Sequence, residues 1–340
     1  MSLVQQMMIK NQPTDDTMKL TLLLCFLTVL SALAATEEQI HKRFSVQSGG
    51  TLMVDVDFGS IDVSTHATDE VVVDVWRKVS RKTKAAEEAF LQDRPVTFTQ
   101  DGSSVTVRSH RKTTASWSVS GWSRTEGKYT ITVPARFHAQ LKTAGGGISA
   151  SDLTGDVKAH TSGGGLRFAR LRGALDGDTS GGGIHVAECE GTLKIHTSGG
   201  GLDVAGGAGS LEGSTSGGSI AVKKFRGPAR VRTSGGGITI ENVLGKVDGS
   251  TSGGSVSAVL PAPLPDDVKL STSGGSVTVR VPADAAFDLD AETSSGRVSS
   301  DLPVTVVGKT ERGRLKGAVN GGGKSVILRS SSGGIRVKKL

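Results

Sequence analysis

Cysteine is almost absent from this chain, whose 340 residues contain only Cys25 and Cys189. Cys25 lies in the apolar run 20–30, which follows Met18-Lys19 and precedes an Ala-Leu-Ala cleavage pattern at 32–34. This arrangement predicts a signal peptide over residues 1–34 of an exported chain, with Met18 as an alternative start and an uncleaved anchor as the other reading. Cleavage would leave one thiol, which excludes an intrachain disulfide even though export permits one.

Aromatic residues are also rare, at 4% with a single tyrosine, whereas glycine is abundant with 47 copies. Such a composition alone would suit a disordered polymer. The apolar residues nevertheless recur with a strict period, which excludes that class and indicates one elongated folded domain.

Neither sign of charge dominates, because the chain has 40 lysines and arginines and 33 acidic residues, which gives a net charge of +7. The positive excess lies in residues 77–84, in residues 108–112 and in the C-terminal tail. We therefore expect an anionic partner, such as a lipid headgroup or an acidic polysaccharide, to meet the ends of the molecule. No nucleic-acid partner and no cofactor is expected.

What the chain does contain is one repeated phrase. Thr-Ala-Gly-Gly-Gly-Ile begins at Thr143, and Thr-Ser-Gly-Gly followed by Gly or Ser returns every 18 residues as far as Thr251. It returns after 21 residues at Thr272 and again at Thr293, and finally as Ser-Ser-Ser-Gly-Gly-Ile from Ser330. A short fixed period is typical of a stack of units, none of which buries a hydrophobic face alone.

Each period has the same internal pattern when its threonine is counted as position 0. Apolar residues alternate with polar ones at positions 5 and 7 and again at 14 and 16, which predicts two strands with one buried face each. Glycines after the serine and at position 12 mark two corners. Position 10 is inward, so Cys189 there is expected to be a small buried residue rather than a nucleophile. The sequence predicts an all-β, single-stacked parallel β-solenoid (β-helix) with 18-residue, two-strand coils.

The outward positions 15 and 17 test the coil length independently. Basic and acidic periods alternate there, as Lys158, Asp176 and Lys194 show. Coils of 18 residues, stacked about 4.8 Å apart, place opposite charges side by side, whereas coils of 36 residues would stack like charges. The threonine at position 0 shares the inward parity of positions 14 and 16. This predicts a buried hydroxyl column bonded to corner backbone groups rather than an outward ice-binding face.

The N-terminal part, residues 44–142, is rich in strand patterns but irregular, which predicts a cap and the first coils. A weaker form of the phrase at Phe58 indicates where the solenoid begins. One short helix is expected over residues 84–92, with Thr83 as its N-cap.

The regular solenoid is expected over residues 143–300, with C-terminal coils and a cap over 301–340. Three prolines at 261, 263 and 265 predict a surface loop inserted at a corner, since proline fits poorly inside a ladder. The chain is expected to close on a last strand whose Lys338 and Lys339 discourage edge pairing.

The motifs that could indicate catalysis or metal binding lack the neighbouring residues and elements that such sites require. Residues 323–325 (Gly-Lys-Ser) resemble part of a phosphate loop, but the first glycine and the following helix are missing. Asp203 matches a calcium-binding repeat in one period only. Of the candidate metal ligands His160, His185 and His196, the first and last lie two coils apart, about 10 Å, too far for one metal. We expect no catalytic, cofactor-binding or metal residues and no enzyme.

One expected loop, residues 109–128, carries two tryptophans among serine and glycine. Tryptophan on a polar loop can stack on a sugar ring or dock on a membrane, although packing against the cap is the alternative. With the basic residues around it, this loop is the candidate ligand-binding site: Trp117, Trp122, Arg108, Arg111, Lys112 and Arg124.

Three motifs of the chain, taken together, resemble those of a known protein family. An exported chain with SGGTLMVDVDFGSIDV at 48–63, repeated TSGGGI and TSGGSI coils, and NGGGKSVILRSSSGGIRVKKL at 320–340 resembles the bacterial “putative adhesin” family, a domain of unknown function. The likeness covers nearly all of the mature chain. It implies a β-solenoid fold and a cell-envelope or extracellular location, and it supplies no catalytic or binding residues.

The leading hypothesis is a non-catalytic exported β-solenoid that presents an extended surface for adhesion or cell-envelope interaction. It would be periplasmic, on the outer surface or extracellular, without a transmembrane span once the signal is cleaved. Its partner would be a cell-surface glycan, an anionic envelope component or another protein. A carbohydrate or anionic-glycan binding module is the first alternative, and a polysaccharide-active enzyme the second.

Overall fold

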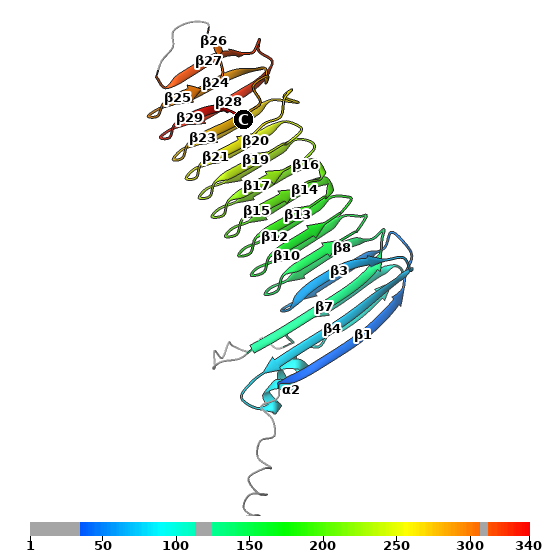
Figure 1. The fold of residues 1–340 in the computed structure, drawn as a ribbon. Coiled ribbons are helices and arrows are strands. Elements are labelled where there is room, and N and C mark those ends of the chain that lie inside the picture. The colour runs from blue at the N-terminus through cyan, green and yellow to red at the C-terminus, as the bar shows by residue number, and fades with distance from the viewer. Residues whose placement is uncertain (1–34, 113–123, 307–311) are drawn as a thin grey trace, which may run out of the picture.

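The computed structural model describes residues 35–112, 124–306 and 312–340. Over these residues the chain forms a rod of stacked flat coils, built from 29 strands in two sheets, one of 14 strands and one of 15 (Figure 1). The predicted β-solenoid is confirmed. The predicted signal peptide lies outside the described residues, and within them no helix is both long and apolar enough to cross a membrane.

Sixteen strands, β8 to β23, form the regular middle of the rod, with two strands in each coil. Their bounds are β8 (His138–Thr143), β9 (Ile148–Ser151), β10 (Val157–Thr161), β11 (Leu166–Ala169), β12 (Leu175–Thr179), β13 (Ile184–Ala187), β14 (Glu190–Thr197), β15 (Leu202–Ala205), β16 (Ala208–Thr215), β17 (Ile220–Lys223), β18 (Ala229–Thr233), β19 (Ile238–Glu241), β20 (Val247–Thr251), β21 (Val256–Val259), β22 (Val268–Thr272) and β23 (Val277–Val281). Odd-numbered strands lie in one sheet and even-numbered strands in the other, and neighbours are parallel.

The register confirms the 18-residue coil. Ile184 pairs with Leu166 on one side and Leu202 on the other, and all three are at most 2% exposed. The outward charges alternate as predicted, because Asp176 lies between Lys158 and Lys194.

The threonine column is buried and bonded to the corners, as predicted. In one coil the Thr197 hydroxyl donates to the carbonyl of Gly182 on the preceding coil at 2.7 Å. It also accepts the backbone N–H of Gly200 at 3.3 Å. The same pair of bonds recurs with Thr161, Thr215, Thr233, Thr251 and Thr272. The hydroxyls therefore satisfy backbone groups that would otherwise be buried without partners.

The N-terminal end does not follow chain order. It comprises β1 (Thr36–Ser45), β2 (Thr51–Val56), β3 (Ser60–His66), β4 (Glu70–Ser80), α2 (Lys84–Asp93), β5 (Thr97–Asp101), β6 (Ser104–Ser109) and β7 (Arg124–Pro134). The coil of β2 and β3 lies between the coil of β6 and β7 and the coil of β8 and β9. Antiparallel strands β4 and β1 extend one sheet beyond β7, and β5 extends the other beyond β6.

Helix α2 confirms the predicted short helix and its cap. The hydroxyl of Thr83 accepts the backbone N–H of Ala86 at 3.3 Å. The helix packs on β4 and β1 and buries Leu91 and Glu87. It therefore covers part of the N-terminal end of the rod (Figure 1).

The C-terminal end is also out of chain order. It comprises β24 (Phe287–Thr293), β25 (Val298–Ser300), β26 (Val304–Val306), β27 (Arg314–Val319), β28 (Lys324–Ser330) and β29 (Ile335–Lys339). The last coil in sequence, β28 and β29, lies between the coil of β22 and β23 and the coil of β24 and β25. The expectation that Lys338 and Lys339 lie on a closing edge strand is therefore wrong. Antiparallel β27 and β26 follow β24 and complete that sheet.

The three prolines lie in the connection from β21 to β22, as predicted. Leu264 at the centre of this loop turns inward and is buried, while Pro263 and Pro265 on either side are exposed. The insertion accounts for the 21-residue spacing without interrupting the parallel pairing of β20 with β22.

Candidate functional site

The corner between position 9 and position 12 of each coil carries a row of charges. We call the outward residues at positions 9 and 11 the corner ridge: Asp152, Thr154, Arg170, Arg172, Glu188, Glu190, Gly206, Ala208, Lys224, Arg226, Asn242 and Leu244. The non-glycine residues at position 9 adopt left-handed backbone, with φ between 53° and 64°. The residue at position 10 then turns inward, so positions 9 and 11 project on either side of the corner.

Glycine at position 12 is required by the close approach of successive coils. A Cβ atom on Gly173 would lie 2.5 Å from the carbonyl oxygen of Gly155 on the preceding coil. Both residues have positive φ, 144° and 151°. Glycine therefore lets the corners stack at the strand spacing and holds the ridge residues in register.

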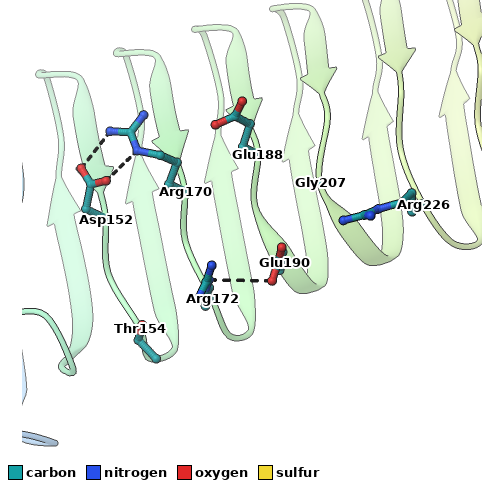
Figure 2. Close-up of a pocket in the computed structure, with 8 residues that line it drawn as sticks. All are labelled: Asp152, Thr154, Arg170, Arg172, Glu188, Glu190, Gly207 and Arg226. Carbon is teal, nitrogen blue, oxygen red and sulfur yellow. Dashed lines mark hydrogen bonds and ion pairs between the residues drawn. The ribbon is translucent and has the colours of Figure 1, made fainter.

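Ion pairs connect neighbouring coils in the first part of the ridge (Figure 2). The Arg170 guanidinium donates from Nε to Asp152 Oδ1 at 2.6 Å and from Nη2 to Oδ2 at 2.8 Å. The hydrogen bonds from Arg170 lower the pKa of the Asp152 carboxyl. Arg172 Nε lies 3.8 Å from Glu190 Oε2. Because these pairs are exposed and screened by solvent, each contributes little to stability.

The ridge is interrupted at one coil, where residues 206–208 are Gly-Gly-Ala. We call this interruption the notch. Its glycines and alanine are half-buried, while the charged residues on either side are exposed. A hollow of about 530 Å³ runs along the ridge and includes Gly207 in its lining. Figure 2 shows the Arg226 side chain extending toward Gly207.

Only part of the notch is dictated by backbone packing. A Cβ atom on Gly207 would lie 2.2 Å from the carbonyl oxygen of Cys189, so glycine is needed there. A Cβ atom on Gly206 would meet nothing closer than Glu188 Cγ at 3.5 Å, an ordinary contact. Other coils carry Asp, Arg, Glu, Lys or Asn in left-handed backbone with φ between 53° and 64°, whereas Gly206 has a φ of 78°. Space does not exclude a side chain at Gly206, but its backbone conformation favours glycine.

A second hollow, of about 860 Å³, lies along the edge where even-numbered strands reach the serine corner. Its lining is mostly serine and threonine, from Ser214 to Ser331, with His196, Arg232, Glu292 and Arg329 among them. Exposed hydroxyls at one per coil can exchange hydrogen bonds with a polar ligand, but they provide no activated nucleophile.

The structure places the predicted ligand-site residues as follows. Trp117 and Trp122 lie outside the described residues. Arg111 is engaged in the cap, because its Nε lies 3.2 Å from Asp93 Oδ2 and its backbone N–H donates to Asp57. Arg124 Nε lies 3.7 Å from Glu126. Arg108 on β6 and Lys112 are exposed.

The three histidines considered as metal ligands each face a polar residue of the next coil. His160 Nδ1 lies 2.8 Å from Asp178, His185 Nδ1 lies 3.5 Å from Asp203, and His196 Nδ1 lies 2.8 Å from Ser214 Oγ. In the part of the chain that the structure describes, no group of three or more His, Cys, Asp or Glu residues could hold a metal ion. Cys189 is buried, and its burial raises the pKa of the thiol.

The corner ridge was missed at the sequence level. Its signal is present, because positions 9 and 11 carry the same sign within a coil and alternate between coils: Arg170 and Arg172, Glu188 and Glu190, Lys224 and Arg226. The alternation used to fix the coil length was taken from positions 15 and 17 alone. Tabulating every outward position would have revealed the ridge and its interruption.

Comparisons with known proteins complete the description. Three solved structures are similar to this chain: a “putative cell adhesion protein” from Clostridium sporogenes ATCC 15579 (11% identity, TM-score 0.25), a “putative adhesin” from Bacteroides fragilis NCTC 9343 (13%, 0.29) and a “putative adhesin” from Parabacteroides merdae ATCC 43184 (11%, 0.37). They cover 90%, 89% and 89% of this chain and 100%, 97% and 96% of their own. No curated protein matches. The family model described as Toastrack DUF4097 matches residues 51–338. Because that match spans most of the sequence, the chain belongs to the Toastrack DUF4097 family.

Proposed function

We propose that this protein is a non-catalytic, exported β-solenoid whose outer columns form an extended surface for adhesion or cell-envelope interaction. The filled interior is the observation that carries the proposal. Leu166, Ile184 and Leu202 represent inward columns that run the length of the rod and are at most 2% exposed. Since the inside is occupied by the chain's own side chains, ligand contacts belong to the outside.

The outside repeats the same kinds of group at a fixed spacing. Each coil adds one residue to each outward column about 4.8 Å from the last. A polymeric partner with its own repeat can therefore make many weak contacts at once, and their sum gives avidity that no single exposed pair provides. The alternating charges around Arg230, whose Nε lies 3.2 Å from Asp248, and the serine edge are such columns.

The proposed location is the cell envelope or the extracellular space. The apolar run and the Ala-Leu-Ala pattern in residues 20–34 support export. The partner classes are a cell-surface glycan, an anionic envelope component or another protein.

Fractionation of cells of the source organism, with an antibody against the protein, tests the location. We expect the protein in the envelope or medium fraction, and recovery in the cytoplasm would overturn the proposal. Purified protein of residues 35–340 should also bind isolated cell envelopes, and the bound amount should rise with protein concentration until the envelope surface is covered. Neutralising the basic columns with Lys158→Gln, Lys194→Gln and Arg230→Gln should weaken that binding. The control carries Lys158→Arg, Lys194→Arg and Arg230→Lys, which keep the positive charges.

A glycan-binding module remains the second candidate. The observation in its favour is that Arg108 and Lys112 are exposed at the edge of the segment that carries the tryptophans. A glycan array that compares the intact protein with the Trp117→Ala/Trp122→Ala variant tests it. Equal and negligible binding by both proteins would remove this candidate and leave the envelope proposal untouched.

A further inference from the structure

We propose that the corner ridge joins two copies of this chain side by side and antiparallel, about a two-fold axis through the notch at residues 206–208. The occupant of the notch is thus the same ridge of a second molecule. This inference goes beyond the proposed function and does not depend on it.

The charges on the two coils that flank the notch are opposite. The coil before it carries Glu188 and Glu190, and the coil after it carries Lys224 and Arg226, at the same positions 9 and 11. In each sheet these coils lie one strand away from the notch coil. The ridge therefore has an acidic pair and a basic pair at equal distances on either side of its interruption.

Two-fold symmetry converts this order into complementarity. In an isologous dimer each patch faces itself. With the axis across the rods, position 9 faces position 9, and the coil before the notch faces the coil after it. Glu188 then meets Lys224 of the partner subunit, and Glu190 meets Arg226 of the partner subunit. The symmetry repeats both contacts, giving four opposite-charge pairs.

A parallel arrangement fails the same test. With the axis along the rods, position 9 of each coil faces position 11 of the equivalent coil. The acidic pair would then face the acidic pair, and Lys224 would face Arg226 of the partner subunit. Like charges facing each other oppose association, so the ridge selects the antiparallel pair.

The next coils outward fit the antiparallel pair as well. Arg172 would face Leu244 of the partner subunit, and Arg170 would face Asn242 of the partner subunit. Leu244 is 48% exposed and, within the described residues, is one of two exposed large hydrophobic side chains. The aliphatic stem of an arginine can cover such a side chain while its guanidinium stays in water.

Three of the four charges beside the notch are available for a partner, and Glu190 also lies 3.8 Å from Arg172 of its own chain. Among the residues that the structure describes, Glu188, Lys224 and Arg226 have no ion-pair partner within 4.0 Å in their own chain. The notch coil itself contributes only Gly206, Gly207 and Ala208, so a second ridge meets no long side chain from that coil. A Cβ atom at Gly206 would find room in the chain itself, and its absence leaves that room open to a second surface.

The notch lies at the midpoint of the rod. Strand β15, which enters it, is the eighth of 14 in its sheet, and β16, which leaves it, is the eighth of 15. An antiparallel pair centred there overlaps along its whole length, with the two ends level.

Sedimentation equilibrium of residues 35–340 over a range of concentrations tests the inference. We expect a monomer–dimer equilibrium at low ionic strength that weakens at about 1 M salt, where the Debye length falls to about 3 Å. Small-angle scattering should give a dimer with the length of one rod and twice its cross-section. A folded protein that stays monomeric at low salt, or a dimer of doubled length, would overturn the proposal.

Charge reversal sharpens the test. The Glu188→Lys/Glu190→Lys variant has an all-basic ridge centre, and the Lys224→Glu/Arg226→Glu variant has an all-acidic one. Each alone should associate about tenfold more weakly or worse, whereas an equimolar mixture should form a heterodimer at least as tight as the wild type. Asp176→Lys/Glu212→Lys, which changes net charge equally on another face, should associate like the wild type. Failure of the mixture to recover association, with both variants folded, would refute the pairing.

Discussion

The same type of hydrogen bond joins neighbouring coils in the middle of the rod and at its two ends, but the sequence separation between the bonded residues differs. In the middle, the threonine hydroxyls from Thr161 to Thr251 donate to a glycine carbonyl 15 residues earlier, as Thr197 does to Gly182. At the C-terminal end, Thr293 donates to Gly333, 40 residues later, at 2.8 Å. At the N-terminal end, Thr143 donates to Gly59, 84 residues earlier, at 2.9 Å. The bond between hydroxyl and corner therefore defines a coil, whichever segment supplies it.

The ends also bury different chemistry from the middle. The middle buries apolar side chains, Phe168 and Phe225 among them, and neutral threonine hydroxyls. The N-terminal end buries Arg77, which is 1% exposed and donates to the Glu38 carboxylate, to the carbonyl of Arg94 and to Ser109 Oγ. A buried guanidinium needs all of these partners, since losing one leaves a costly unpaired charge. The middle is thus stabilised by repetition, and the ends by specific side chains and by segments inserted out of order.

Removing an inserted coil should have the largest effect. Deleting residues 324–340 removes β28 and β29, which separate the coil of β22 and β23 from the coil of β24 and β25. We expect β24 to β27 to lose hydrogen-exchange protection because their parallel partner is gone, while β10 to β17 stay protected.

The matched control deletes one regular coil, residues 179–196, and joins Asp178 to Thr197. Because every middle coil presents the same register, the rod should close with one coil fewer and remain folded, apart from a small cost of stacking like charges. Both deletions are followed by hydrogen exchange with mass spectrometry. Equal damage from the two would show that the ends and the middle do not differ.

A single methyl group at the serine corner should have the next largest effect. A Cβ atom on Gly164 would lie 2.1 Å from the carbonyl oxygen of Gly146, and backbone on both coils would have to move. We expect Gly164→Ala to lower the free energy of unfolding by more than about 4 kcal/mol. The neighbouring Gly163→Ala, whose Cβ would lie 3.7 Å from Ala144 O, should stay within about 1 kcal/mol of the wild type. Chemical denaturation of both variants checks this, and similar losses would contradict it.

Loss of one column hydroxyl should cost less. Thr197→Val keeps the shape but leaves the Gly182 carbonyl and the Gly200 N–H without their partner. We expect a loss of about 1 to 3 kcal/mol in the free energy of unfolding. Thr192→Val, an exposed change on β14, is the control and should be nearly neutral. If the two substitutions cost the same, the column does not stabilise the middle through these bonds.

The middle of the fold could be predicted from sequence because its contacts join residues a fixed 18 apart. The parity that turns Ile184 inward also places it beside Leu166 and Leu202, so one period specifies the whole stack. The coil order at the ends could not be predicted in this way. The Ser149 hydroxyl on β9 bonds to Asp62 on β3, 87 residues away. The phrase at Phe58 marks β3 as a strand of the solenoid, but no fixed spacing places β7, which comes later in the chain, on the far side of β3.

Strand β1 and the corner ridge were missed for separate physical reasons. In β1 only Ile40 and Phe44 are large apolar residues, because the strand lies at the edge of its sheet and buries little. The ridge residues follow no apolar alternation, since their left-handed backbone belongs to a turn. Patterns of burial therefore find the core but neither an edge strand nor the charged turn residues of the ridge.

The smallest expected effect concerns pH and separates the N-terminal end from the middle. Glu87 on α2 accepts the hydroxyl and N–H of Thr36 on one oxygen, at 2.6 Å and 3.0 Å, and the N–H of Arg81 on the other, at 2.9 Å. These hydrogen bonds, that of the Thr36 hydroxyl first, lower the pKa of the Glu87 carboxyl below its usual 4.5. A lowered pKa in the folded state means that Glu87 stabilises the cap above about pH 4.5 and stops doing so as pH falls through the folded value.

The Glu87→Gln variant measures this contribution. It should lower the hydrogen-exchange protection of β1 and α2 at neutral pH. The difference from the wild type should shrink as pH falls from 4.5 through the lowered pKa of the folded state, because the wild-type carboxyl then becomes protonated too. Protection of β12 to β17 should be the same in both proteins at every pH, because Glu87 contacts only the cap. A difference at β1 that stays constant from pH 7 to pH 3 would show that the Glu87 charge does not hold the end in place. A difference that spreads into the middle would show that the cap and the regular coils unfold as one unit.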